Sequence, residues 1–129
     1  MEKIINQKKT VKAELLTQLI RAKNMMEEDL SRKVNIATLA KEATLSKFHF
    51  VRCYKNAFGL SPYQYILNKR LERSMELLNE GKWMVTDVAY QVGFNDIYSF
   101  SKSFKKHFNA CPSRFSLSAI IMFNCIIFC

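Results

Sequence analysis

This chain of 129 residues contains only three glycines and two prolines, so few positions can interrupt a helix. The scarcity of glycine also excludes a loop that cradles phosphate groups, because such loops place several glycines close together. The four cysteines form no CxxC pair, and no signal peptide precedes them. This cysteine usage predicts free thiols in a reducing compartment rather than disulfides or a zinc site.

Groups that could carry catalysis are equally scarce. His49 and His107 are the only histidines, and the sequence places no cysteine or carboxylate cluster beside them. Glu72, Glu76 and Glu80 recur every four residues, which is the spacing of an ordinary solvated helix face. We therefore predict a protein that is not an enzyme and that requires no metal or other cofactor.

Acidic residues are missing from two long windows. No Asp or Glu occurs between Glu42 and Glu72, nor after Asp96, although the net charge of the chain is +9. Lysines that served only solubility would be interspersed with acids. The placement of charge therefore indicates two basic surfaces, each suited to a polyanion such as nucleic acid.

Long hydrophobic runs are also missing, except at the end of the chain. Residues 117–129, LSAIIMFNCIIFC, carry no charge. The run is too short to span a bilayer, which needs about 20 apolar residues, so we expect no membrane partner. Three interpretations of this tail stay open: it covers an apolar groove, it mediates self-association, or it is an aberrant ending of a coding region.

The sequence does contain an internal repeat of about 50 residues. Each copy has a short helical pattern, a turn and a second helical pattern that is aromatic on one face and basic on the other. The aromatic stripe of the second copy is spaced every four residues. The aligned positions are Ile36, Leu39, Ala40 and Ala43 with Val85, Val88, Ala89 and Val92, and Phe50, Tyr54, Phe58 and Pro62 with Phe100, Phe104, Phe108 and Pro112.

Each copy therefore predicts a helix-turn-helix unit. Gly93 suits the tight turn of the second copy, because glycine readily adopts a positive φ. Thr44 stands at the equivalent place in the first copy, and its β-branched side chain resists that conformation. We therefore expect the first turn to have a different geometry from the second.

The predicted fold is all-α, with about seven helices that form two helix-turn-helix units joined by a long linker helix. Residues 1–10 are predicted to be a flexible basic terminus, and 11–116 a single domain with units at 11–60 and 82–116. The linker helix, 61–79, would span about 27 Å, near the ~34 Å between major-groove faces one turn apart. The expected helix caps are Asn35, Ser46, Ser61, and either Asn95 or Asp96, whereas Trp83 and Met84 are poor caps and Cys111 is a weak one.

The two copies resemble a known family. Residues 87–115, DVAYQVGFNDIYSFSKSFKKHFNACPSRF, are similar to the signature of the AraC/XylS family of bacterial transcription regulators. Residues 39–66, LAKEATLSKFHFVRCYKNAFGLSPYQYI, resemble the first helix-turn-helix of that family. The resemblance covers about residues 15–115, and it implies two recognition helices in successive major-groove segments of one DNA duplex.

The resemblance also implies partners and a location. It is closest to the small stand-alone members, so we expect a monomer on double-stranded DNA, with no small-molecule effector and with RNA polymerase as a second candidate partner. A cytoplasmic, nucleoid-associated regulator is expected. The operator, the regulated genes and the choice between activator and repressor are not fixed by the sequence.

Outward positions of the two recognition helices supply the candidate contacts. The fork of Arg52 suits guanine O6 and N7, whereas Phe48 and Val51 can make only apolar contacts, most simply with a thymine methyl group. For Phe48 and Ile97, burial in the core is the competing interpretation. The base-contact candidates are Phe48, Val51, Arg52, Ile97, Tyr98, Ser101 and Lys102, and the phosphate-contact candidates are Lys47, Lys55, Lys105 and Lys106.

A function of a different class remains to be weighed. The chain could be a helical protein-interaction module, or a truncated family member without independent regulatory activity. Such a module would keep the aromatic stripes and lose the outward bases. Arg52, Lys55, Lys102, Lys105 and Lys106 are all retained, which favours DNA binding.

Overall fold

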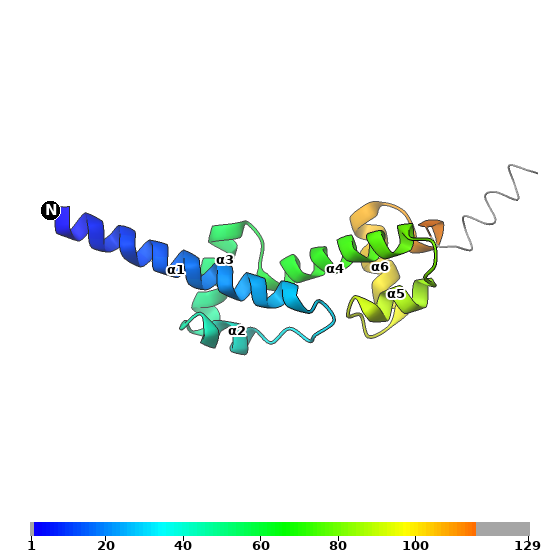
Figure 1. The fold of residues 1–129 in the computed structure, drawn as a ribbon, viewed down its shortest axis with the longest axis horizontal. Coiled ribbons are helices and arrows are strands. Elements are labelled where there is room, and N and C mark those ends of the chain that lie inside the picture. Colours follow the sequence, from blue (N-terminus) through cyan, green and yellow to red (C-terminus); the bar gives the residue numbers. More distant parts are fainter. Residues whose placement is uncertain (1, 116–129) are drawn as a thin grey trace, which may run out of the picture. The chain divides into compact units, whose positions relative to one another are not determined.

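The computed structural model describes residues 2–115, and their side chains from residue 12 onward. Helices and their connections make up the whole of this described part, with no strand in it. The elements are α1 (Glu2–Glu28), α2 (Ile36–Glu42), α3 (Lys47–Phe58), α4 (Pro62–Asn79), α5 (Val85–Gln91), α6 (Ile97–Phe108) and the 3₁₀ helix η1 (Pro112–Phe115) (Figure 1). The all-α prediction is confirmed, and the apolar tail at 117–129 lies outside the described residues.

One predicted boundary was wrong, and one predicted helix is of a different type. The first helix begins at Glu2 rather than at Val11, because the first 28 residues contain no glycine or proline to stop it. The predicted seventh helix does begin at Pro112, but as far as the structure describes it, to Phe115, it is the 3₁₀ helix η1, in which the Arg114 amide donates to the Cys111 carbonyl (3.1 Å). In the first copy, Ser61 caps α4 by accepting from the Gln64 amide (3.2 Å). The thiol of Cys111 is a much poorer acceptor than that hydroxyl.

The chain divides into two compact units. Unit 1 comprises residues 1–29 and 34–66, and unit 2 comprises residues 30–33 and 67–129, of which the structure describes those up to 115. The division falls inside α4, so residues 62–66 of this helix belong to unit 1 and 67–79 belong to unit 2. The predicted linker helix therefore contributes to both units.

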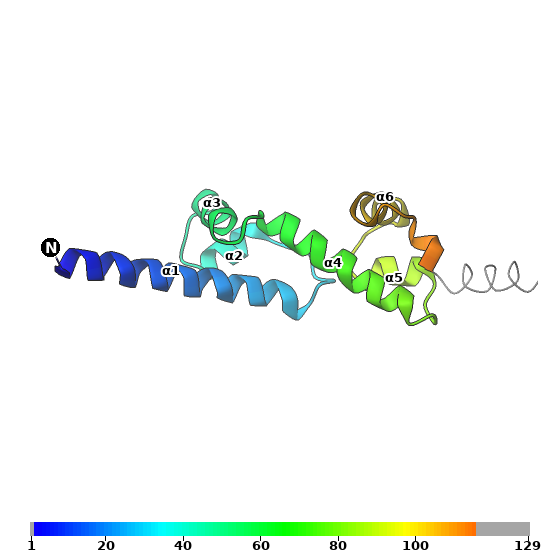
Figure 2. The same cartoon turned by 90° about the horizontal axis from the view of Figure 1, so that it is seen from above.

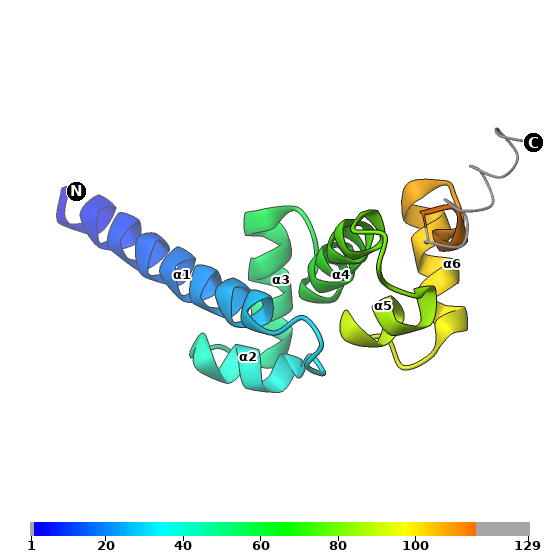
Figure 3. The same ribbon diagram turned by 45° about the vertical axis from the view of Figure 1, so that its right-hand side comes forward.

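Unit 1 is built on α1. Helices α2 and α3 lie against α1 and against each other, as the views in Figures 1 and 3 agree. The buried residues of α1 recur at intervals of three and four residues, which is the spacing of one helix face. The buried side chains of unit 1 are Leu19, Ala22, Met26, Ile36, Leu39, Ala40, Ala43, Phe50, Tyr54, Pro62 and Ile66.

Unit 2 has its own core between α5, α6 and the later turns of α4. Helix α6 contacts both α5 and η1 (Figure 2). Phe100 and Phe104, from the predicted aromatic stripe, are completely buried there, and Phe108 and Phe115 pack against them at the edge. The other buried members of this core are Leu71, Leu77, Leu78, Val88, Ala89 and Val92.

The repeat seen in the sequence is also a repeat in three dimensions. Helices α2 and α5 each have 7 residues, and α3 and α6 each have 12. Helices α3 and α6 both end at a residue in the left-handed conformation, Gly59 (φ 80°) in the first copy and Asn109 (φ 58°) in the second. Asparagine tolerates this conformation better than most residues, so it can replace the glycine.

The turn that precedes α3 corrects an expectation. Thr44 adopts a positive φ of 56°, as Gly93 does in the second copy with 103°. Both turns close with the same pair of hydrogen bonds: Thr44 and Leu45 donate to the carbonyls of Lys41 and Ala40, and Gly93 and Phe94 donate to those of Tyr90 and Ala89. This is the Schellman pattern of a helix C-terminus. The two turns share one geometry even though threonine is poorly suited to it.

In unit 2, Arg70 of α4 fixes segment 30–33 next to the turn at Gly93. The Nε of Arg70 donates to the Leu30 carbonyl (2.7 Å), and its Nη2 donates to the Arg32 carbonyl (2.9 Å). A Cβ on Gly93 would lie 2.7 Å from the Leu30 oxygen and 3.0 Å from the Arg70 guanidinium. Glycine is therefore required at position 93 both for its φ and for this close approach.

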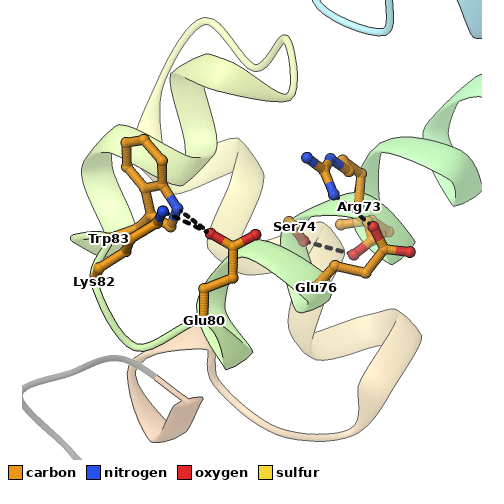
Figure 4. A network of polar contacts seen from close by, with 7 residues as sticks. Arg73, Ser74, Glu76, Glu80, Lys82 and Trp83 are labelled. Carbon is orange, nitrogen blue, oxygen red and sulfur yellow. Dashed lines mark hydrogen bonds and ion pairs between the residues drawn. The ribbon is translucent and has the colours of Figure 1, made fainter.

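The connection from α4 to α5 is fixed by polar contacts. Glu80 accepts a hydrogen bond from the Trp83 indole (2.8 Å) and lies 3.6 Å from the Lys82 ammonium (Figure 4). The indole bond, and then the positive charge of Lys82, lower the pKa of Glu80. One turn earlier, Arg73 pairs with Glu76 (2.8 Å) (Figure 4).

None of the helices in the described chain combines the length and the apolar character that a membrane span requires.

Candidate nucleic-acid interface

Helix α3 presents an exposed aromatic and cationic pair. Ser46 caps the helix by accepting from the His49 amide (3.2 Å), as the sequence predicted. Phe48 is 77% exposed, so the competing interpretation that it belongs to the core is wrong. The guanidinium carbon of Arg52 lies 5.8 Å from the centroid of the Phe48 ring, one helical turn away. A cation over an aromatic ring is restrained in its orientation, which leaves its hydrogen-bond donors available at the surface.

The remaining candidates on α3 differ in exposure. Lys47 and Lys55 are exposed at the two ends of the helix. Val51 is half-buried, so its side chain is shared between the surface and the packing of unit 1. No acidic side chain occurs on this helix or its caps, so nothing there offsets its positive charge locally.

Helix α6 repeats this surface with different side chains. Tyr98 is 74% exposed and stands where Phe48 does, and Lys102 is exposed at the position of Arg52. Ile97 is 40% exposed and is therefore not a core residue, whereas Ser101, like Val51, is half-buried. The last turn of the helix adds Lys105, Lys106 and His107, all exposed.

The start of α6 is fixed by a carboxylate. Of the two expected caps, Asp96 is the one used: it accepts hydrogen bonds from the Ser99 amide (2.7 Å) and the Ser99 hydroxyl (2.9 Å). These bonds, the amide bond first, lower the pKa of Asp96. Helix α5 begins at Val85, and the residue at its N-cap, Met84, makes no side-chain cap hydrogen bond, as its sequence implied. Recognition helices α3 and α6 are both capped, whereas α5 relies on packing.

Sequence reasoning missed three supporting residues. Asn109 could have been found, because the 50-residue offset aligns it with Gly59. Gln18 and Arg70 could not, since each acts on a turn far away in the sequence: Gln18 Nε2 donates to the Thr44 hydroxyl (3.0 Å), and Arg70 holds the segment beside Gly93. Neither Gln18 nor Arg70 carries a signal in its immediate neighbours.

Alternative chemistries find no site in the described part of the chain. No group of three His, Cys, Asp or Glu side chains there could hold a metal ion. Cys53 is half-buried on α3 and Cys111 is exposed, and both are free thiols. The candidate binding surfaces in the described residues are therefore the exposed faces of α3 and α6, which carry basic and aromatic side chains.

Comparison with known proteins yields a consistent result. The model of a family described as a helix-turn-helix domain matches residues 39–117. The probable transcriptional regulator LumQ of Photobacterium leiognathi is 33% identical over 92 residues, which cover 71% of this chain and 37% of LumQ. The probable transcription factor PqrA of Proteus vulgaris is 33% identical over 92 residues, covering 70% of this chain and 75% of PqrA.

A solved structure agrees with these relatives. It is a transcriptional regulator with an AraC-type DNA-binding domain from Chromobacterium violaceum. Its TM-score is 0.71 at 25% identity, over 78% of this chain and 89% of that chain. The chain spans only 37%, 34% and 29% of the lengths of three of the curated relatives that it matches.

Proposed function

The chain belongs to the AraC/XylS family of helix-turn-helix transcription regulators, and we propose that it regulates transcription by inserting α3 and α6 into adjacent major-groove segments of one DNA duplex. The family is one of DNA-binding regulators and not of enzymes. The observation that carries the two-helix proposal is the repeated surface: an exposed aromatic residue followed four positions later by an exposed base, Phe48 with Arg52 on α3 and Tyr98 with Lys102 on α6.

The proposed contacts separate into two classes by their place on each helix. The first turns carry the base-contact candidates Phe48, Val51, Arg52, Ile97, Tyr98, Ser101 and Lys102. Lys47, Lys55, Lys105 and Lys106 flank them and are proposed to bind phosphate groups, which position the protein without reading sequence. Val51 and Ser101 are half-buried, so only part of each side chain is exposed at the surface of its helix. We propose that these two residues contact bases with that exposed part.

The partner is double-stranded DNA. We propose that a single copy of the chain occupies one site, since each copy already carries two recognition helices. Contact with RNA polymerase, and action in the cytoplasm on the nucleoid, are proposed from the family alone. The competing function is that of a protein-interaction module, which would have no need of two acid-free basic helices.

A salt titration tests the proposal. If the two units together neutralise six phosphates, affinity for a duplex should fall by about 10³-fold between about 50 and about 200 mM salt. Sites selected from a random duplex pool should show two conserved segments about one helical turn apart. A flat salt dependence, or a pool with no enriched sequence, would contradict DNA recognition by this chain.

A further inference from the structure

We infer that Gln18 of α1 is a positioning residue for the recognition helix α3, and that the first helix-turn-helix reads DNA accurately only while Gln18 holds the turn at Thr44. The inference rests on the proposed function and deepens it. It assigns a role in recognition to a side chain that lies on neither helix of that helix-turn-helix.

The first observation is the conformation of Thr44. Its φ of 56° is a region that β-branched residues rarely adopt, and the equivalent residue of the second copy is a glycine. Both turns nevertheless close with the same hydrogen bonds. The first copy therefore reaches a geometry that its own residue disfavours, and an interaction from outside the turn must compensate.

The second observation is the bond that Gln18 supplies. The Thr44 hydroxyl donates its hydrogen to the Ala43 carbonyl (2.7 Å), so its oxygen can only accept from other groups. Gln18 Nε2 donates to that oxygen at 3.0 Å, from a residue 26 positions earlier in the chain. Both residues belong to unit 1. The amide therefore connects α1, the scaffold of unit 1, to the turn that precedes α3.

The position of the turn explains the consequence for DNA. Thr44 is followed within two residues by Ser46, the cap of α3, and then by Lys47 and Phe48, which are contact candidates. If Thr44 relaxes toward a more favourable φ, the first turn of α3 changes direction. In those states α3 cannot read its bases, although α6 still can. The average binding is then weaker, and it depends less on the sequence of the half that α3 reads.

The second copy provides an internal comparison. Gly93 needs no side-chain bond to hold its positive φ, because it has no Cβ. The effect of losing Gln18 should therefore be confined to the bases read by α3. A loss of overall stability would instead weaken the reading of both halves of the site.

The test uses Gln18→Met, which keeps the length of the side chain and removes the donor. The full chain selects its site from a random duplex pool, and Arg52→Ala identifies the half read by α3. Duplexes with single base changes in each half are then titrated well below the melting temperature. We expect Gln18→Met to bind the selected site about two- to tenfold more weakly. The loss of affinity caused by a single base change should become smaller in the half that α3 reads. In the half that α6 reads, it should stay unchanged.

Thr44→Gly is the matched control, because glycine adopts the positive φ without help. In that background Gln18→Met should have no further effect, and this pair decides the question even if the single Gln18→Met variant does not fold. Three results would overturn the inference. Gln18→Met could distinguish the selected duplex from its single-base variants as well as the wild type does, or lose this ability equally in both halves. It could also weaken binding further in the Thr44→Gly background. A wild-type chain that selects no sequence would instead overturn the proposed function, and this inference with it.

Discussion

Tyr54 and Phe104 occupy equivalent positions in the two copies of the repeat, and both side chains are completely buried. Each packs against the aromatic residue that follows it by four positions, Phe58 and Phe108, with ring centroids 4.6 Å apart in both copies. The difference is one hydroxyl group. That of Tyr54 has no hydrogen-bond partner in the part of the chain that the structure describes.

Tyr54→Phe should therefore stabilise the protein. A buried hydroxyl without a partner costs about 1–3 kcal/mol, so removing it should raise the free energy of unfolding by up to that amount. Urea denaturation of the two chains measures the difference. Tyr65→Phe is the control, because Tyr65 donates a hydrogen bond to Glu27 and its loss should destabilise. A fall in stability for Tyr54→Phe would mean that the hydroxyl has a partner.

The same residue predicts a dependence on alkaline pH. Burial, and then the nearby negative charge of Glu27, raise the pKa of Tyr54 above its ordinary value. The folded state therefore holds this proton more tightly than the unfolded state. The contribution to stability is complete below pH ~10, the pKa of an unfolded tyrosine, and is lost as the pH rises above it. Between pH 9 and 12, taken as approximate limits of the titration, wild-type stability should fall more steeply than that of Tyr54→Phe.

Substitutions of Gly59 and Gly93 should separate two effects of a side chain: strain from a positive φ, and a clash with neighbouring atoms. Gly93→Ala places a Cβ 2.7 Å from the Leu30 carbonyl oxygen, in addition to a strained φ of 103°. Gly59→Ala meets nothing within 4 Å and suffers only from its φ of 80°. We expect about 1–2 kcal/mol of destabilisation for Gly59→Ala and distinctly more for Gly93→Ala. Equal melting temperatures for the two variants would show that the backbone at Leu30 moves away from the added Cβ at little cost in stability.

The cap of α6 predicts behaviour in acid. Because Ser99 lowers the pKa of Asp96, the folded state binds that proton less tightly than the unfolded state. The stabilising contribution is present above pH ~3.9, the unfolded value, and is lost as the pH falls through the lower folded value. Asp96→Ser, which copies Ser46 of the first unit, should keep the cap and lose this acid dependence. Asp96→Ala should lose the cap at every pH and melt several degrees earlier.

Substitutions of base-contact candidates and of phosphate-contact candidates should affect DNA binding differently. Arg52→Ala is expected to relax specificity at one half of the site by about 1–3 kcal/mol, and Lys102→Ala to do so about one helical turn away. Lys106→Ala should weaken all sequences alike and reduce the salt slope by about one phosphate. Titrations against duplexes with single base changes measure these effects. If Arg52→Ala and Lys102→Ala altered the same base pairs, the arrangement with two reading helices would be wrong.

The sequence by itself determined the helices and their faces. The limits of α4, the caps Asn35, Ser46 and Ser61, and the buried stripe of Phe100 and Phe104 all follow from residues within about one helical turn of each other. Helix periodicity, capping and side-chain exposure are local properties, so a local pattern suffices to predict them. The exposure of Lys102 follows from the same periodicity, whereas the structure was needed to decide between exposure and burial for Phe48.

Tertiary structure alone decided the conformation of Thr44 and the place of segment 30–33. The φ of Thr44 is set by competition between its β-branched side chain, which disfavours a positive value, and the bond from Gln18, 26 residues away, which compensates. Segment 30–33 joins unit 2 because Arg70 binds its carbonyls across about 40 residues of sequence. Local preferences at such positions differ by only about 1–3 kcal/mol, and one contact from a distant helix can reverse them.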